Sequence, residues 1–137
     1  METLRQTRTY VEIIQHAFAD FASGKINKII DNCTNDVLWI LPKNPGVPIT
    51  GTFEGKDELL NFFELLAENV DYSNFEPKEY FSDKEVVIAL GHQSGKVKKT
   101  GKTFDHDWCM VFRLRAAKIY HYYGFVDTRD QAESFRM

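Results

Sequence analysis

Two histidines, His92 and His106, are the residues in this sequence best suited to proton transfer. The unperturbed pKa of imidazole is about 6.5, so a histidine beside an apolar pocket can act as acid or base near neutral pH. If the turn between the two β-prone segments that carry them is centred at Lys99, His92 lies directly opposite His106. The alternative is a structural pair whose rings bond to each other, to the backbone or to water.

Tyr122 is a third candidate, because a buried phenol hydroxyl needs a hydrogen-bond partner and can polarise a ligand carbonyl. It belongs to the aromatic segment IYHYYGFVD. A hairpin centred near Ala116 places Tyr122 opposite Met110, so that Tyr120 and Tyr122 face the same side as Met110. The alternative is a Tyr122 that only holds the core together, and a slip by one residue would reverse the face.

The segment around His106 alternates between two kinds of side chain, and in a strand alternate residues lie on opposite faces. The face predicted to point inward carries Phe104, His106, Trp108, Met110, Phe112 and Leu114. The register that pairs the histidines also places Leu90 opposite Trp108. We therefore predict a ligand pocket lined by Phe18, Trp39, Leu90, Phe104, Trp108, Met110, Phe112 and Tyr120.

The elements that position these residues are helices first and strands afterwards, which predicts an α+β fold. Apolar spacing predicts helices over Thr9–Ser23, Ile26–Asn35 and Lys56–Val70, with a strand at Val37–Leu41 followed by a Pro- and Gly-rich loop. Period-two patterns then predict consecutive antiparallel strands near Tyr72–Phe81, Glu85–Ser94, Thr103–Leu114 and Lys118–Val126. A short helix is expected from Asp130 to Met137.

The chain has 137 residues, of which 43% are hydrophobic and 14% aromatic. This composition fits a single domain over residues 1–137, with rings in a core, a pocket or an interface. The formal net charge of −3 gives no basic footprint for nucleic acid or for an anionic membrane. No apolar stretch approaches the ~18–20 residues of a membrane-spanning helix.

Metal and cofactor motifs are missing from the sequence. Cys33 and Cys109 stand without a CxxC pattern or a Cys/His cluster, so we expect neither a zinc site nor a disulfide framework but reduced thiols in a cytoplasmic protein. The GTFEG segment lacks the Lys-Ser/Thr pair of a phosphate-binding loop. The expected partner is a small molecule, with no metal or cofactor.

Short motifs in a characteristic order carry a family resemblance. They are Ala22-Ser23-Gly24, Asn35-Asp36-Val37-Leu38-Trp39, Gly51-Thr52-Phe53-Glu54-Gly55-Lys56 and the closing Phe125-Val126-Asp127-Thr128. From about Tyr10 to Thr128 the sequence resembles the SnoaL-like branch of the nuclear transport factor 2-like (NTF2-like) superfamily.

The resemblance implies a cone-shaped α+β fold, in which a curved antiparallel sheet wraps around three helices from the N-terminal half. It also implies an internal pocket for a small, mostly apolar molecule of aromatic, polyketide-like or terpenoid-like character. Because many relatives form homodimers through the outer face of the sheet, the resemblance also implies a homodimer. Here Val87, Ala89, Cys109 and Val111 are expected to supply apolar surface to that face.

Departures from the family pattern argue against the ketosteroid isomerase mechanism. Gly124 stands where relatives often carry an acid, three residues before Asp127, while Ala17 and Leu41 replace the expected tyrosine and aspartate. One predicted function is instead isomerisation, cyclisation or dehydration assisted by His106, His92 and Tyr122. The alternatives are a non-catalytic binding module and a structural dimeric domain.

Overall fold

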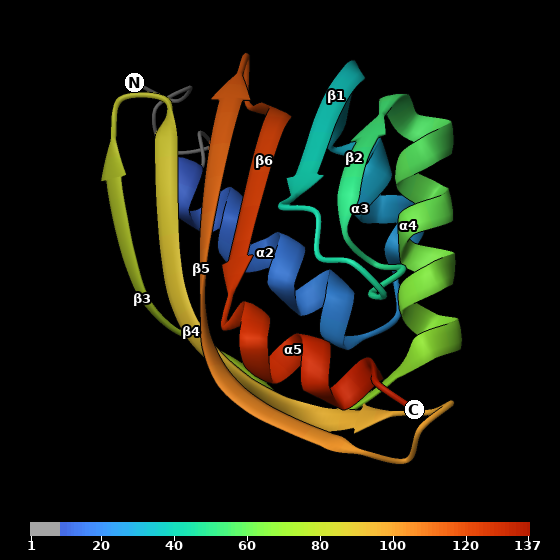
Figure 1. The fold of residues 1–137 in the computed structure, drawn as a ribbon. Helices are drawn as coiled ribbons and strands as arrows, with labels where there is room; N and C mark the ends of the chain where they lie inside the picture. Colours follow the sequence, from blue (N-terminus) through green and yellow to red (C-terminus); the bar gives the residue numbers. More distant parts are fainter. Residues whose placement is uncertain (1–8) are drawn as a thin grey trace, which may run out of the picture.

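The structure is a computed structural model that describes residues 9–137. Its helices are α2 (Tyr10–Ala22), α3 (Ile26–Asp31), α4 (Gly55–Asn69) and α5 (Thr128–Phe135). Its strands are β1 (Cys33–Leu41), β2 (Gly51–Glu54), β3 (Val70–Asp83), β4 (Val86–Val97), β5 (Thr103–Arg115) and β6 (Lys118–Val126) (Figure 1). The predicted α+β class is confirmed. Among residues 9–137, no helix is both long and apolar enough to span a membrane.

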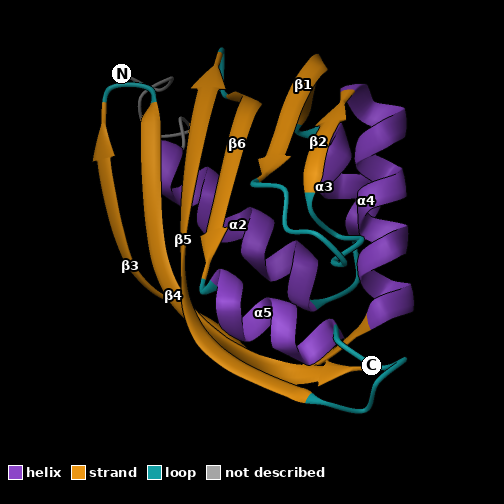
Figure 2. Ribbon diagram, viewed as in Figure 1, coloured by secondary structure: helices purple, strands orange, loops and turns teal. Residues whose placement is uncertain are grey.

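One six-stranded sheet runs in the order β2-β1-β6-β5-β4-β3. The predicted meander from β3 to β6 is antiparallel throughout, whereas β1 pairs with β6 in parallel. Figure 2 shows β3, β4 and β5 bending under α5 and around α2, while α3 and α4 cover the region of β1 and β2. The sheet is therefore curved but not closed, and its concave side holds the helices.

The strands before α4 differ most from the prediction. Helix α3 ends at Asp31 rather than near Asn35, because the chain from Cys33 onward pairs with Ile119 of β6. A short strand, β2, lies at the end of the Pro- and Gly-rich loop, where Phe53 pairs with Trp39 of β1. Strand β2 has only four residues, which is too few for an alternating pattern that would predict a strand from the sequence.

The bend of the sheet has a local cause in β3 and β4. Strand β3 has two bulges against β4, and bulges increase twist and curvature. Two glycines of β4, Gly91 and Gly95, lie opposite Trp108 and Phe104 of β5. A Cβ at Gly91 would lie 2.3 Å from the Trp108 ring, and one at Gly95 would lie 2.9 Å from the Phe104 ring. The rings thus cover the glycines, a pairing that suits a curved sheet.

Helix α2 begins with the predicted capping box. The backbone N–H of Glu12 donates to the Thr9 hydroxyl at 3.1 Å, and the N–H of Thr9 donates to the Glu12 carboxylate at 2.9 Å. The helix buries Ile14 completely and directs Phe18 at the sheet, where its ring centroid lies 5.6 Å from that of Trp108. Helix α2 is therefore fixed at its start and anchored on the concave face.

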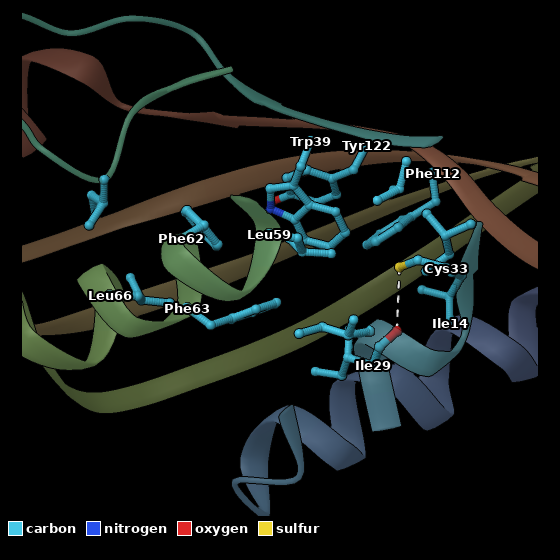
Figure 3. Packing of buried hydrophobic residues seen from close by; sticks show 14 of the residues in the cluster. Ile14, Ile29, Cys33, Trp39, Leu59, Phe62, Phe63, Leu66, Phe112 and Tyr122 are labelled. Atoms are coloured by element: carbon cyan, nitrogen blue, oxygen red, sulfur yellow. Dashed lines mark hydrogen bonds between the residues drawn. The ribbon is translucent and has the colours of Figure 1, made fainter. Parts of the chain in front are cut away.

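Helix α4 packs a second apolar layer against β1 and β2 (Figure 3). Its buried residues are Leu59, Phe62, Phe63 and Leu66. Phe62 and Phe63 approach the ring of Trp39, which itself stacks on Tyr122 at a centroid distance of 3.9 Å. Cys33 is buried beside α3, where its thiol donates to the Ile29 carbonyl oxygen at 3.3 Å.

The β4–β5 turn has an even number of residues, which overturns the predicted register. The N–H of Val97 donates to the Lys102 carbonyl at 2.9 Å, leaving a four-residue loop that ends at Gly101 with a positive φ of 74°. His92 consequently pairs with Asp107 instead of His106. A shift by one residue moves every side chain of one strand to the opposite face relative to its partner.

The β5–β6 turn also differs from the prediction, but the face of Tyr122 is preserved. Ala116 and Ala117 form a two-residue turn, and a bulge next to Leu114 shifts the pairing by one more residue. Tyr122 therefore lies opposite Phe112 rather than Met110, still on the concave side. Two shifts of one residue restore the original face.

Candidate functional site

A cavity of about 90 Å³ lies between the concave face of the sheet and helices α2, α4 and α5. It is lined by the predicted pocket residues Phe18, Trp39, Met110 and Phe112 and by Tyr122, the predicted hydrogen-bond donor. No Asp, Glu, Lys, Arg or His is among its lining residues within the described range 9–137. Its polar groups come from tyrosines, from two glutamines, Gln93 and Gln131, and from the indole N–H of Trp39, which is buried without a hydrogen-bond partner among residues 9–137.

Tyr122 is the central ring of the cavity wall. It stacks on Trp39 with an interplanar angle of 15° and lies 5.2 Å from the Phe112 ring, measured between centroids. Figure 3 shows these three rings together above Leu59. Aromatic stacking holds Tyr122 in one orientation, so that its hydroxyl keeps a fixed position.

Gly124 leaves the space that the Tyr122 hydroxyl uses. A Cβ at Gly124 would lie 2.4 Å from that hydroxyl oxygen. Burial raises the pKa of Tyr122, so the hydroxyl remains protonated and can donate a hydrogen bond. An acidic side chain at Gly124 is therefore excluded by sterics as long as Tyr122 occupies this position.

Two predicted pocket residues of β5 support the wall from behind. Trp108 is buried, covers Gly91 and stacks on Phe75 at 5.2 Å between centroids. Phe104 is buried as well and covers Gly95. Neither ring is part of the cavity lining. Their contribution is to the shape of the sheet that encloses the cavity.

Leu90 and Tyr120 do not face the cavity, in contrast to the prediction. Leu90 pairs with Cys109 on the convex side because of the even β4–β5 turn. Tyr120 is the residue left unpaired by the β5–β6 bulge. Its ring lies under the Arg115 guanidinium, 4.6 Å from the ring centroid.

His106 lies at the polar end of the concave side, with both ring nitrogens engaged. Nδ1 lies 2.8 Å from Asp130 Oδ2, and Nε2 lies 2.9 Å from the amide nitrogen of Gln93. The His106 side chain is only 4% exposed. It does not line the cavity itself, whereas Gln93 does. His106 thus reaches the cavity through Gln93.

Asp130 links α5 to this histidine. Its Oδ2 accepts from the backbone N–H of Asp105 at 2.9 Å as well as from His106. Burial alone would raise the pKa of Asp130, but these hydrogen bonds and the charge of His106 hold that pKa below its ordinary value. The carboxylate is therefore ionised and accepts the His106 proton.

His92 lies on the convex face, so the predicted histidine pair does not form. Its Nε2 lies 2.5 Å from Asp105 Oδ1 and its Nδ1 lies 2.7 Å from Asp107 Oδ1. Hydrogen bonds to Asp107 and Asp105 raise the pKa of His92, and the pKa of Asp107 is lowered in return. This cluster is separated from the cavity by the sheet.

The convex face carries an apolar strip, although part of its predicted composition is wrong. Val87 and Ala89 point inward and are fully buried. Register and burial assign the strip to Phe81, Ile88, Leu90, Cys109, Val111, Tyr123 and Phe125. Phe81 is 52% exposed and Phe125 is 43% exposed, which is unusual for phenylalanine.

The family model of the SnoaL-like domain matches residues 14–122. The chain belongs to the SnoaL-like family. The predicted family resemblance is confirmed. No match was found among curated proteins.

Solved structures similar to this SnoaL-like chain show the same fold. An NTF2-like protein from Burkholderia xenovorans LB400 has a TM-score of 0.85 and 28% identity, over 93% of this chain and 95% of that one. An NTF2-like protein from Burkholderia thailandensis E264 has a TM-score of 0.86 and 27% identity, over 96% and 100% of the two chains. TerC, co-crystallised with polyporic acid, has a TM-score of 0.81 and 21% identity over 92% and 97%. The cone-shaped SnoaL-like fold is thereby confirmed.

Three polar residues of this SnoaL-like site were not predicted: Gln93, Asp130 and Gln131. The sequence carries a signal for Gln93, because strand alternation places it beside Gly91 and Gly95 on one face. A wrong length for the β4–β5 turn assigns this face of β4 to the convex side, and Gln93 is then not recognised as a site residue. Asp130 and Gln131 belong to a helix whose only buried residues are polar, Gln131 and Ser134, so apolar periodicity does not mark its inner face. Within residues 9–137, no cluster of three or more His, Cys, Asp or Glu is arranged to hold a metal ion.

Proposed function

We propose that this SnoaL-like protein binds a small, uncharged, mostly apolar molecule in its interior cavity. The observation that carries the proposal is a cavity wall without a charged side chain, which exposes the Tyr122 hydroxyl between aromatic rings. Burying an unpaired charge in this cavity would cost far more free energy than contact with the aromatic rings would contribute. An uncharged aromatic, polyketide-like or terpenoid-like molecule suits these walls.

The size of the cavity limits which ligands enter without rearrangement. A cavity of ~150 Å³ holds one benzene ring, and this cavity measures about 90 Å³. Met110 lines the cavity and is a flexible side chain that can move to admit a single ring. A larger ligand requires displacement of Phe18 and Phe21 on α2. The co-crystallisation of TerC with polyporic acid supports ligand binding by this fold.

A second candidate function is isomerisation, cyclisation or dehydration assisted by His106, with Tyr122 as hydrogen-bond donor. The contact between Asp130 and His106 favours it, because a carboxylate that holds Nδ1–H leaves Nε2 as a base. To reach a substrate, Nε2 must exchange Gln93 for the ligand. Binding without chemical change needs no such exchange and is the function we favour. Mass spectrometry of a ligand before and after incubation separates the two.

We further propose a second copy of this chain as the partner that covers the convex strip. The strip continues over β3, β4, β5 and β6, and Tyr123 stacks on Phe125 at its β6 end with a centroid distance of 5.5 Å. A symmetric dimer buries the same patch on both subunits and removes these rings from water.

Filling the cavity tests the binding proposal. Ala17 of α2 lines the cavity, whereas Ala19 on the same helix is exposed. In an NMR titration with benzene, we expect saturable shifts in the wild type and in Ala19→Phe, and loss of binding in Ala17→Phe. Saturation with equal affinity in all three proteins would mean that benzene binds elsewhere, and absence of binding to the wild type would contradict the proposal.

A further inference from the structure

The contact between Gln93 and His106 fixes where the imidazole proton lies. The two atoms that meet are both nitrogens, Gln93 Nε2 and His106 Nε2, at 2.9 Å. An amide nitrogen can only donate a hydrogen bond, so His106 Nε2 accepts and carries no proton. The single ring proton therefore sits on Nδ1, which faces the Asp130 carboxylate at 2.8 Å. Each group in the series Asp130–His106–Gln93 has one consistent role.

The same contact determines which end of the Gln93 amide is left for a ligand. Its nitrogen is directed at His106, and no residue from 9 to 137 donates a hydrogen bond to its Oε1. Gln93 is only 7% exposed as a residue and lines the cavity. An amide oxygen that receives no hydrogen bond from the protein can accept one from a ligand, and a ligand that supplies the donor gains affinity.

Gln131 provides a comparison within the same cavity. It also lines the cavity and is buried to a similar degree, with 6% exposure. Its Oε1 already accepts a hydrogen bond from Asn44 Nδ2 at 3.0 Å. The two glutamines thus differ at their carbonyl oxygens: that of Gln131 already accepts a hydrogen bond, whereas no residue from 9 to 137 donates to that of Gln93.

We infer that Gln93 is a specificity-determining residue, which presents its carbonyl oxygen to the cavity and selects ligands that carry a hydrogen-bond donor. This inference rests on the proposed binding function and narrows its ligand class to uncharged aromatic hydroxyl compounds, such as phenols and enols. Tyr122 supplies the complementary donor to an oxygen elsewhere on the ligand. His106 acts as a positioning residue, because it determines which end of the Gln93 amide faces the cavity.

The role of His106 gives the selectivity a pH dependence. When Nε2 gains a proton it can no longer accept from an amide nitrogen, so the Gln93 amide turns over and directs its NH₂ group at the cavity. The groups that face His106 are Asp130 from α5, Gln93 from β4 and the Phe104 ring of its own strand, with the Asp107 carboxylate nearby. The cavity then prefers ligands that carry a hydrogen-bond acceptor over ligands that carry a hydrogen-bond donor.

Paired titrations with benzene and phenol test the inference at a pH where His106 is neutral. One neutral hydrogen bond predicts that the wild type binds phenol about threefold to tenfold more tightly than benzene. In Gln93→Met, which keeps the length of the side chain, this ratio should fall to about one. In the matched variant Gln15→Met, at an exposed position of α2 outside the cavity lining, it should stay at the wild-type value. Equal affinities for phenol and benzene in the wild type, or an unchanged ratio in Gln93→Met, would overturn the inference.

A pH series on the wild type needs no substitution and therefore does not depend on the folding of a variant. The protonation of His106 is followed by its ring NMR signals while the affinities for phenol and benzaldehyde are measured. We expect the phenol preference at high pH to become a benzaldehyde preference once Nε2 is protonated. A ratio that is independent of His106 protonation would overturn the positioning role. If benzene binds but the ratios are flat, the selectivity inference alone fails; if no probe binds, the proposed function fails with it.

Discussion

His92 shows that a histidine suited to chemistry can be committed to a surface ion cluster instead. Its ring nitrogens contact the Asp105 and Asp107 carboxylates on the convex face. The local sequence does not distinguish His92 from His106, because each histidine lies within a segment with the pattern of a strand. What separates them is the face of the sheet, and that face depends on the β4–β5 turn.

The raised pKa of His92 leads to a pH-dependent contribution to stability. Its folded-state pKa lies above the ordinary value of 6.5, so the contribution is complete below 6.5 and is lost as the pH rises through the folded pKa. Relative to His92→Gln, the wild type should therefore gain more stability at mildly acidic pH than at alkaline pH. Urea unfolding at the two pH values measures this difference.

An NMR titration of the His92 ring provides the control for that experiment. The ring should titrate above 6.5 in the wild type, and its titration should move down toward 6.5 in Asp107→Asn. A wild-type His92 that titrates at or below 6.5 would contradict the ion cluster.

At the scale of elements, the sequence predicts faces within a strand more reliably than pairing between strands. Alternation in β5 correctly placed Phe104, His106, Trp108 and Phe112 on the inner face. The position of β4 beside them depends on whether its turn has an even or odd number of residues. The hydrophobic pattern of β4 does not show which of its faces points inward, because successive residues such as Ile88 and Ala89 are apolar on both faces.

The β5–β6 turn carries backbone strain that a substitution can relieve. Ala116 and Ala117 have φ values of 51° and 66°, the left-handed region that glycine tolerates better than alanine. We expect Ala117→Gly to stabilise the protein by about 1 kcal/mol in urea unfolding. The same substitution at Ala19, in α2, should destabilise the protein by about 1 kcal/mol. Destabilisation by Ala117→Gly would contradict the observed turn.

Helix α5 was predicted as an element, but its role was not. Apart from Phe135, which packs against the core, its docking contacts include polar ones: Asn44 Nδ2 donates to the Thr128 carbonyl oxygen at 2.9 Å, and the Thr100 hydroxyl donates to the Ser134 carbonyl oxygen at 2.6 Å. Such contacts follow from tertiary arrangement rather than from local pattern. The part of the candidate site that α5 supplies, Asp130 and Gln131, therefore became visible only in the structure.

At the scale of the whole molecule, the apolar convex strip predicts self-association. Val111 lies near the middle of the strip, paired with Ile88 on one side and Tyr123 on the other. Light scattering should give the wild type twice the 15.9 kDa mass of the chain and Val111→Asp the mass of one chain. Leu60→Asp, at an exposed position of α4, should remain dimeric. A monomeric wild type would contradict the proposed dimer.

The central claim is that the cavity between the sheet and the helices is a binding site for an uncharged aromatic molecule. A crystal structure of the protein saturated with phenol tests it most directly. We predict the phenol ring inside the cavity, in contact with Phe18 and Tyr122, with its hydroxyl within hydrogen-bonding distance of Gln93 Oε1. Phenol found only on the surface, with the cavity still closed by its own side chains, would contradict the account.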